Sequence, residues 1–186
     1  MKNLCVPISA GFLFVMVSSA TLSQTSTTAA IPVTADNFKR AETDMYFTMF
    51  AKEGAFGKFF HHRDLPLENT SVRPNRDTLY SYAVFDLDAG PVTVTLPDAG
   101  KRFMSLMVIN QDHYALETVY APKDYTYTRD RIGTRYVFLA ARTLVDPADP
   151  QDVKQAQTLQ GAGPASWSCR TGIRRARKKC VMRCWC

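Results

Sequence analysis

The 186-residue chain carries 23 Lys and Arg against 17 Asp and Glu, a balance that usually suggests a nucleic-acid partner. Seven of the cations lie from Gly161 onward, where there is no carboxylate, which leaves 16 cations against the same 17 anions and a formal charge of −1 for the rest of the chain. Four of the five cysteines and both tryptophans also lie in this tail. The positive charge therefore belongs to the tail, and the remainder gives no support for nucleic-acid binding.

The N-terminus has the features of a secretory signal peptide. Lys2 is followed by an apolar run over residues 4–17 and then by small residues, with cleavage expected after Ala20 or Ala30. The run is shorter than the ~20 apolar residues that span a bilayer, although an uncleaved anchor is the rival interpretation. We expect a periplasmic or secreted protein with no stable membrane span after cleavage. The absence of cysteine between Cys5 and the tail fits an oxidising compartment.

Residues 31–160 are long enough to form one domain with a core of its own. Residues 34–54 predict a helix that Thr34 or Asp36 would cap and Gly54 would end. Its apolar residues recur every three or four positions, and we expect them to form the buried stripe: Phe38, Ala41, Met45 and Met49.

A loop is expected over residues 57–77, and short β-type runs separated by Gly, Asp and Pro turns follow it. These runs are residues 78–87, 91–97, 102–110, 113–120 and 134–142. The run 102–110 is apolar on both alternating faces, which indicates an interior strand. Asp149 and Pro150 then begin a second helix. The predicted fold class is mainly β: an antiparallel β-sandwich preceded by an N-terminal helix and followed by the start of a second helix.

Several short blocks of this chain resemble one known family. They are Pro74-Asn75, Asp77-Thr78-Leu79-Tyr80-Ser81, Asp86-Leu87, Gly90-Pro91, the turn "LPDAGKRF", the strand "GTRYVFLAAR" and the helix "NFKRAETDMYF". They resemble the DUF 1254 family of bacterial, mostly exported proteins, over most of residues 31–160. The resemblance implies a β-sandwich that is often followed by a helical segment and a second β-rich domain, DUF 1214. The family has no established activity, so the resemblance implies a fold and a compartment rather than a reaction.

The tail departs from this pattern at Gly161, and we interpret residues 161–186 as a frameshift product of a longer protein. Reading the tail in another codon frame permits "LELPDWDQASQKKVRDALLV", which has no cysteine and resembles the helical segment expected next. A structural zinc site is disfavoured because Cys180 and Cys184 form one pair and Cys169 stands alone. We expect a disordered tail, and we expect the apolar surface that the lost segment would cover to promote self-association.

Two groups of residues could carry chemistry in the body. Asn75, Arg76, Asp77, Tyr80 and Ser81 cluster around the start of the first predicted strand. Turn formation explains Asn and Asp before a strand, and Tyr80 would pack on a sheet face. The alternative is a polar pocket at the sheet edge, with Asp77 as base or acceptor and Arg76 binding an anionic group.

Histidines form the second group. His61 and His62 precede Asp64, but adjacent side chains of an extended chain point to opposite faces, so a surface loop is favoured over a metal site. His113 lies between Asp112 and Tyr114 in a predicted turn, where it could act as a general base or simply face solvent. We therefore assign no metal and no cofactor, and we take Asn75, Arg76, Asp77, Tyr80 and His113 as the candidate polar pocket.

No nucleophile motif or glycine-rich phosphate loop is visible in the sequence. We therefore expect an exported, noncatalytic β-sandwich that binds a ligand or a partner. The alternative is the N-terminal part of a hydrolase-like enzyme whose site needs the missing C-terminal DUF 1214 domain. The expected partner is a small molecule or that missing domain, without nucleic acid.

Overall fold

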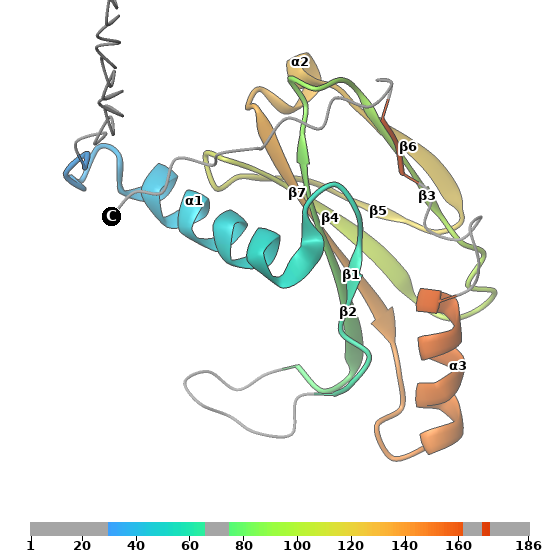
Figure 1. Cartoon of the computed structure of the whole chain (residues 1–186). Coiled ribbons are helices and arrows are strands. Elements are labelled where there is room, and N and C mark those ends of the chain that lie inside the picture. The colour runs from blue at the N-terminus through green and yellow to red at the C-terminus, as the bar shows by residue number, and fades with distance from the viewer. Residues whose placement is uncertain (1–29, 66–74, 162–168, 172–186) are drawn as a thin grey trace, which may run out of the picture.

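The computed structural model describes residues 30–65 and 75–161, and the backbone of 169–171. The predicted signal peptide, through Ala29, lies outside these residues. In chain order the elements are α1 (Phe38–Phe50), η1 (Ala51–Ala55), β1 (Phe60–His61), β2 (Thr78–Asp86), β3 (Val92–Leu96), β4 (Met104–Asn110), β5 (Ala115–Tyr120), β6 (Lys123–Tyr127), α2 (Arg129–Ile132), β7 (Tyr136–Leu144), α3 (Pro150–Gly161) and β8 (Cys169–Thr171) (Figure 1).

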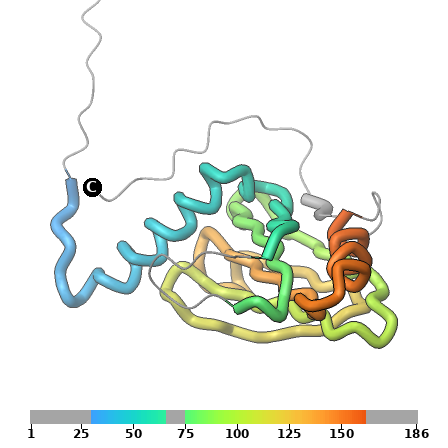
Figure 2. The backbone as a smooth tube through the Cα atoms, turned by 90° about the horizontal axis from the view of Figure 1, so that it is seen from below, coloured from blue at the N-terminus to red at the C-terminus, as the bar shows by residue number. Residues whose placement is uncertain are grey.

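The strands form two antiparallel sheets. The larger has the order β1-β2-β7-β4-β5, and the smaller has the order β6-β3-β8. Helix α1 lies across one face of the large sheet, while the small sheet and α3 lie on the other side (Figures 1 and 2). The mainly β, two-sheet architecture with a helix at each end of the described domain is the predicted fold class, and it is confirmed.

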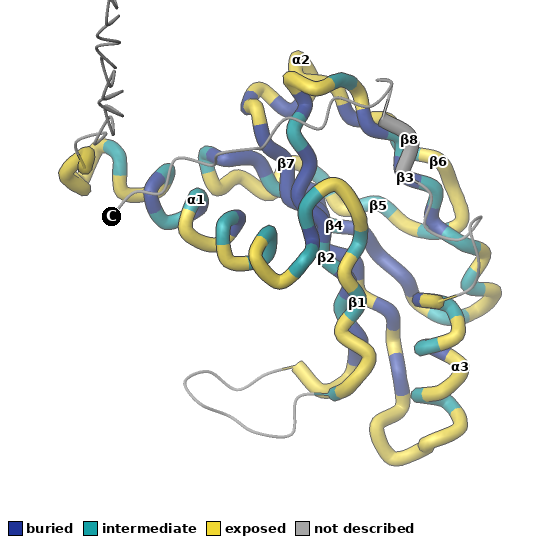
Figure 3. The backbone as a smooth tube through the Cα atoms, viewed as in Figure 1, coloured by how far each residue is buried: buried dark blue, intermediate teal, exposed yellow. Residues whose placement is uncertain are grey.

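Alternation along β2 sends successive side chains to different layers. Ala83 and Phe85 face the small sheet, where they join Val92 and Val94 in the main core. Val84 lies between them in sequence and faces α1, where Phe47 packs. Both faces of the sheet are therefore buried along much of β2, β4 and β7, as the dark blue segments of Figure 3 show.

Helix α1 buries a different stripe from the predicted one. Phe47 is 2% exposed and Thr43 is buried, whereas Met45 and Met49 are 55% and 43% exposed. The outward face of α1 is largely exposed in Figure 3. The expectation was correct for Ala41 and wrong for Phe38, Met45 and Met49, because the docked face contains polar residues whose partners lie in the turn between β4 and β5.

The helix boundaries are partly as predicted. Neither Thr34 nor Asp36 caps α1: its first residue is preceded by Asn37, whose Oδ1 accepts from the backbone N of Thr34 at 2.8 Å. Gly54 does end the regular helix, because it takes a φ of 104°, a conformation that favours glycine. Asp149 caps α3 as predicted, accepting from the backbone N of Gln151 at 2.8 Å.

The five predicted β runs correspond to β2, β3, β4, β5 and β7, and β4 is paired on both sides as an interior strand should be. Neither β6 nor α2 was predicted. The short β1 was also missed, since residues 57–77 were expected to be a loop. A two-residue strand has no periodicity to detect, and β1 forms only because the neighbouring β2 offers it an edge.

The predicted disordered tail lies mostly outside the described residues. Its residues Cys169–Thr171 pair with β3, Val94 lying opposite Cys169. Within the described part of the chain, none of the helices combines the length and apolar character that crossing a bilayer requires.

Candidate functional site

A polar junction joins α1 to the turn between β4 and β5. Three residues on one face of α1 each contact one of three consecutive turn residues. The pairs are Arg40 with Asp112, Thr43 with His113, and Asp44 with Gln111. The α1 residues are three and four positions apart, so they project from the same side of the helix. This junction explains why the docked face of α1 is partly polar.

The turn itself is held rigidly by Asn110 and Gln111. Oδ1 of Asn110 accepts from the backbone N of Asp112 at 3.0 Å and of Tyr114 at 3.1 Å. The Gln111 side chain is 6% exposed, and its Oε1 accepts from the backbone N of Tyr136 at 3.1 Å. Its Nε2 donates to Oδ1 of Asp44 at 2.7 Å. The residues that follow Gln111 are thus fixed against both β7 and α1.

His113 has an unusual backbone and a defined ring orientation. Its φ is 66°, which makes it the non-glycine residue with positive φ among those described. The Thr43 hydroxyl donates to the carbonyl O of Lys39 at 2.8 Å, so it has no second proton to give. In its 2.8 Å contact with His113, Thr43 therefore accepts and Nδ1 of His113 donates. Nε2 is then the nitrogen left to meet a ligand, and it is an acceptor whenever the ring is neutral.

A pocket of about 510 Å³ lies against this histidine, between α1 and the turn. It is lined by Phe38, Lys39, Glu42, Tyr46, Asp112, His113 and Tyr114. Small-molecule sites commonly fall within a few hundred to a thousand cubic ångströms, and this pocket is within that range. Phe38, Glu42 and Tyr46 are four residues apart, so α1 presents them as one line along the pocket wall.

Three contacts engage the charged groups of the pocket wall. A hydrogen bond to Glu42 raises the pKa of Tyr46 above its usual value, so the phenol stays protonated and donates to that carboxylate. The ammonium of Lys39 lies 5.3 Å from the centre of the Tyr114 ring. Asp112, the other anion in the wall, is paired with Arg40. The pocket thus carries cations and anions in balance.

The residues predicted around the start of β2 form a turn and a sheet surface. Oδ1 of Asn75 accepts from the backbone N of Asp77 at 2.8 Å, which is the turn chemistry expected for these residue types. Arg76 is exposed in the same turn. Tyr80 lies on the sheet, its ring centre 5.7 Å from the guanidinium of Arg142.

The five candidate residues do not share one pocket. Asp77 directly precedes β2, which begins opposite Leu144 at one end of β7. His113 follows β4, which ends opposite Val137 near the other end of β7. At a rise of about 3.3 Å per residue, these two ends are roughly 20 Å apart or more. The structure brings His113 together with α1, and it leaves Asn75, Arg76, Asp77 and Tyr80 at the far end of the sheet.

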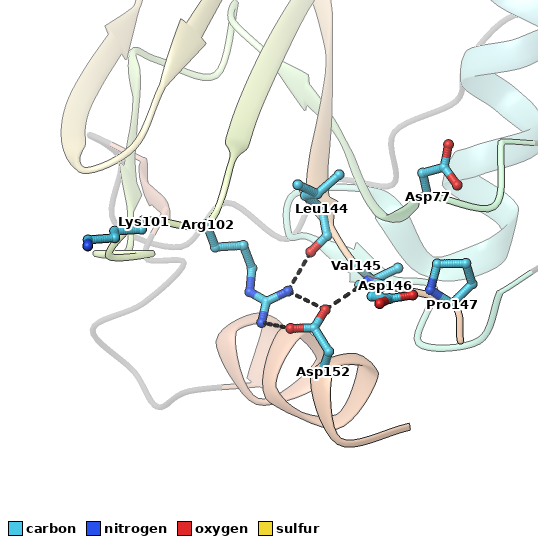
Figure 4. A pocket seen from close by; sticks show the side chains of 8 residues that line it. All are labelled: Asp77, Lys101, Arg102, Leu144, Val145, Asp146, Pro147 and Asp152. Atoms are coloured by element: carbon cyan, nitrogen blue, oxygen red, sulfur yellow. Dashed lines mark hydrogen bonds and ion pairs between the residues drawn. The ribbon is translucent and has the colours of Figure 1, made fainter. Parts of the chain in front are cut away.

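Asp77 borders another pocket, of about 640 Å³, whose centre is an ion pair (Figure 4). Arg102 binds both carboxylate oxygens of Asp152 on α3 and donates to the carbonyl O of Leu144 at 2.7 Å. The bond to Arg102, with a backbone bond from Asp146, lowers the pKa of Asp152 to about 2. Asp77 points away from this pair in Figure 4. The charges already satisfy one another, so their role here is to fasten α3 to the sheet.

A partly buried serine–histidine contact lies beneath the end of α3. Nδ1 of His61 is 2.7 Å from Oγ of Ser81, and Nε2 of Gln160 donates to that Oγ at 3.2 Å. Burial lowers the pKa of His61 from 6.5 to about 4, so the ring is neutral at pH 7. Ser81 is 1% exposed and lies beneath Gln160. His62 instead contacts the ring of Tyr82, so the two adjacent histidines do face opposite ways, as their spacing predicted.

Part of the large sheet is not covered by α1. Phe103, Tyr120 and Leu144 are between 43% and 55% exposed, and the rings of Phe103 and Tyr120 are 5.8 Å apart. These three residues form an exposed apolar surface, which we call the open sheet face. Across the described ranges, no three His, Cys, Asp or Glu side chains gather as they would to hold a metal ion.

The sequence singled out His113 but missed the residues that face it. Glu42 and Tyr46 were hidden because α1 was expected to act only through its apolar stripe. Their four-residue spacing from Phe38 was the available signal, and it marks a mixed aromatic and polar line on one side of the helix. Thr43 carried no such signal, because its partner is 70 positions away along the chain.

The fold and the pocket define a two-sheet antiparallel β domain with a polar pocket beneath its N-terminal helix. Comparison with known families and structures places it further. The chain belongs to the DUF1254 family, described as proteins of unknown function, whose model matches residues 56–162. The predicted resemblance is thereby confirmed.

The crystal structure of the VPA0106 protein from Vibrio parahaemolyticus has a similar fold, with a TM-score of 0.55 at 18% sequence identity. The similarity covers 76% of this chain and 40% of that protein, so this chain spans less than half of the length of its structural neighbour. At this identity the likeness concerns the fold alone. A comparison with curated proteins finds no match.

Proposed function

We propose that this chain is an exported domain that binds a small molecule without transforming it, in the pocket between α1 and the β4–β5 turn. The observation that carries the proposal is the state of His113. Its ring is oriented by Thr43, its turn is anchored by buried hydrogen bonds, and Nε2 is left for a ligand. A non-glycine residue at positive φ is a form of local strain that concentrates at binding and catalytic sites.

Binding is favoured over nucleophilic catalysis by the direction of one hydrogen bond. A histidine that activates a hydroxyl must accept its proton. Here His113 donates to the Thr43 hydroxyl, whose own proton is held by the carbonyl O of Lys39. The pair fixes the ring and generates no nucleophile.

Export is supported by the N-terminal charge, apolar run and small residues around Lys2 and Ala20. It is tested by fractionating an expressing bacterium and sequencing the mature N-terminus. A product that begins at Thr21 or Ile31 in the periplasm or medium is expected. A cytosolic product that keeps Met1 contradicts export without affecting the pocket.

The binding proposal is tested with His113→Asn. Asparagine tolerates positive φ, so the turn keeps its backbone while the imidazole is lost. Small-molecule binding followed by ligand-observed NMR should weaken in this variant. His62→Gln is the matched control, because His62 is an exposed histidine at the other end of the sheet, and it should bind as the parent does. Equal binding by the parent and both variants contradicts the proposal.

A hydrolase-like enzyme that needs a further domain is the second candidate, favoured by the contact between His61 and Ser81. Gln160 donates to Oγ, which leaves the Ser81 proton free to point at Nδ1 of a neutral His61. The 1% exposure of Ser81 requires α3 to move before a substrate can reach it. Ester and glycoside hydrolysis by a longer relative, abolished by the change equivalent to Ser81→Ala, would favour this function.

A further inference from the structure

The hydrogen-bonding groups around the His113 pocket are mostly acceptors, and this property selects a class of ligand. Nε2 of His113 accepts whenever the ring is neutral, because Nδ1 carries the proton donated to Thr43. Tyr46 donates its hydroxyl hydrogen bond to Glu42, so its oxygen is still able to accept one. The Glu42 carboxylate has acceptor sites beyond the one that Tyr46 uses. A ligand must therefore bring several donors.

The charges of the wall argue against an ionic ligand. Lys39 and Glu42 balance each other, and Asp112 is paired with Arg40. An anion would face the Glu42 carboxylate without a guanidinium fork to hold it. An organic ammonium would meet a like charge in the same wall, because the ammonium of Lys39 lies there over the Tyr114 ring. The pocket is thus best matched by a neutral molecule.

Two exposed aromatic rings also belong to the pocket wall. Phe38 is 56% exposed and Tyr114 is 58% exposed, and both line the pocket beside the polar groups. Flat apolar rings pack against the C–H faces of a saturated ring, while the hydroxyls at its edge donate to acceptors nearby. Lys39 supplies a donor for a ring or glycosidic oxygen.

We propose that the ligand of this pocket is a neutral polyhydroxylated ring, of the size of a hexose. Its hydroxyls donate to Nε2 of His113, to Glu42 and to the Tyr46 oxygen, and a C–H face packs on Phe38. This inference rests on the proposed function, since it names the ligand class of the same pocket.

The test uses saturation-transfer NMR on the full chain with three probes at equal concentration: methyl β-glucopyranoside, tetramethylammonium and acetate. The glucoside should bind, and the other two should not. His113→Asn and Glu42→Gln should each weaken glucoside binding about tenfold, the effect of losing one good hydrogen bond to an imidazole or carboxylate acceptor. Met45→Gln, a change on the exposed side of the same helix, is the control and should leave binding unchanged.

Binding of tetramethylammonium or acetate that His113→Asn abolishes contradicts the polyhydroxylated ligand and leaves the proposed binding function standing. Glucoside binding that neither variant weakens contradicts the assignment of the ligand to this pocket. Failure of all three probes to bind overturns the ligand class. If a broader small-molecule screen also finds the same binding in His113→Asn as in the parent, the binding function is overturned as well. Each variant should have the same circular dichroism spectrum as the parent, which shows that a loss of binding is not caused by misfolding.

Discussion

Replacing Gln111 by alanine should destabilise the domain more than any single contact in the pocket suggests. The Gln111 side chain is 6% exposed and joins three parts of the chain. It accepts from the backbone N of Tyr136 on β7 and donates to Asp44 on α1, while its own backbone N donates to Thr134 at 3.1 Å. Alanine removes both side-chain bonds and keeps the backbone one.

The cost follows from what is left behind. Tyr136 is 6% exposed, so its N–H loses a partner at a site that water reaches poorly. A buried donor without a partner costs about 1–3 kcal/mol, and the lost bond to the Asp44 carboxylate adds about 1 kcal/mol at this partly exposed position. We expect the free energy of unfolding to fall by about 2–4 kcal/mol in Gln111→Ala.

Gln111→Glu separates the two bonds. Glutamate keeps an acceptor for Tyr136 but places a carboxylate against that of Asp44. This variant should be destabilised near pH 7 and should recover toward the parent near pH 4, where two facing carboxyl groups share a proton. Gln111→Ala places no titratable group at this position. The difference between its free energy of unfolding and that of the parent should therefore not become smaller at pH 4.

The measurement is denaturant unfolding followed by circular dichroism at both pH values, under reducing conditions. Gln155→Ala is the matched control, because Gln155 is exposed on α3, and it should change the free energy of unfolding by no more than about 0.5 kcal/mol. A Gln111→Ala loss as small as that of the control would show that the turn is not anchored through this side chain. The account of the His113 pocket as a preformed site would then be wrong.

Three further predictions concern the rest of the domain. Phe47→Ala removes a ring that is 2% exposed and should lower the free energy of unfolding, measured in denaturant, by about 3–5 kcal/mol. Met45→Ala, on the exposed side of α1, should lower it by less than about 1 kcal/mol. Comparable losses would mean that α1 docks through the stripe predicted from the sequence, which contains Met45. Burial lowers the pKa of His61 from 6.5 to about 4, so the unfolded chain binds a proton at this histidine at a higher pH than the folded chain does. The free energy of unfolding should therefore fall as the pH is lowered from 6.5 to 4. The expected loss is about 1–2 kcal/mol, because solvent screens the exposed part of the ring. Unfolding measured across that range should show this drop in the parent but not in His61→Gln, and an identical pH profile in both would contradict the shift. The double variant Phe103→Ser and Tyr120→Ser removes two exposed rings of the open sheet face. It should lower the concentration-dependent self-association measured by sedimentation velocity. Unchanged association would mean that another surface is responsible.

Much of the fold could be predicted because it is encoded locally. Alternation and turn residues located five strands, and the cap at Asp149 was predicted from its own neighbours. The β1 strand was missed because its two residues depend on pairing with β2. The buried side of α1 was missed because Thr43 and Asp44 are acceptable there only once His113 and Gln111 supply their hydrogen bonds.

The candidate site was likewise predicted only in part from the sequence. His113 was chosen for its chemistry, and Asp77 was grouped with it, although nothing in the sequence measures the distance between them. The pairing of β2 and β4 with β7 decided that these two residues lie at opposite ends of the sheet. By itself the sequence determined most of the element types and the family, because propensity, capping and pattern act over a few neighbouring residues. Only the tertiary structure decided that α1 faces the β4–β5 turn and that the His113 ring donates to Thr43, since both follow from contacts between segments about 70 residues apart.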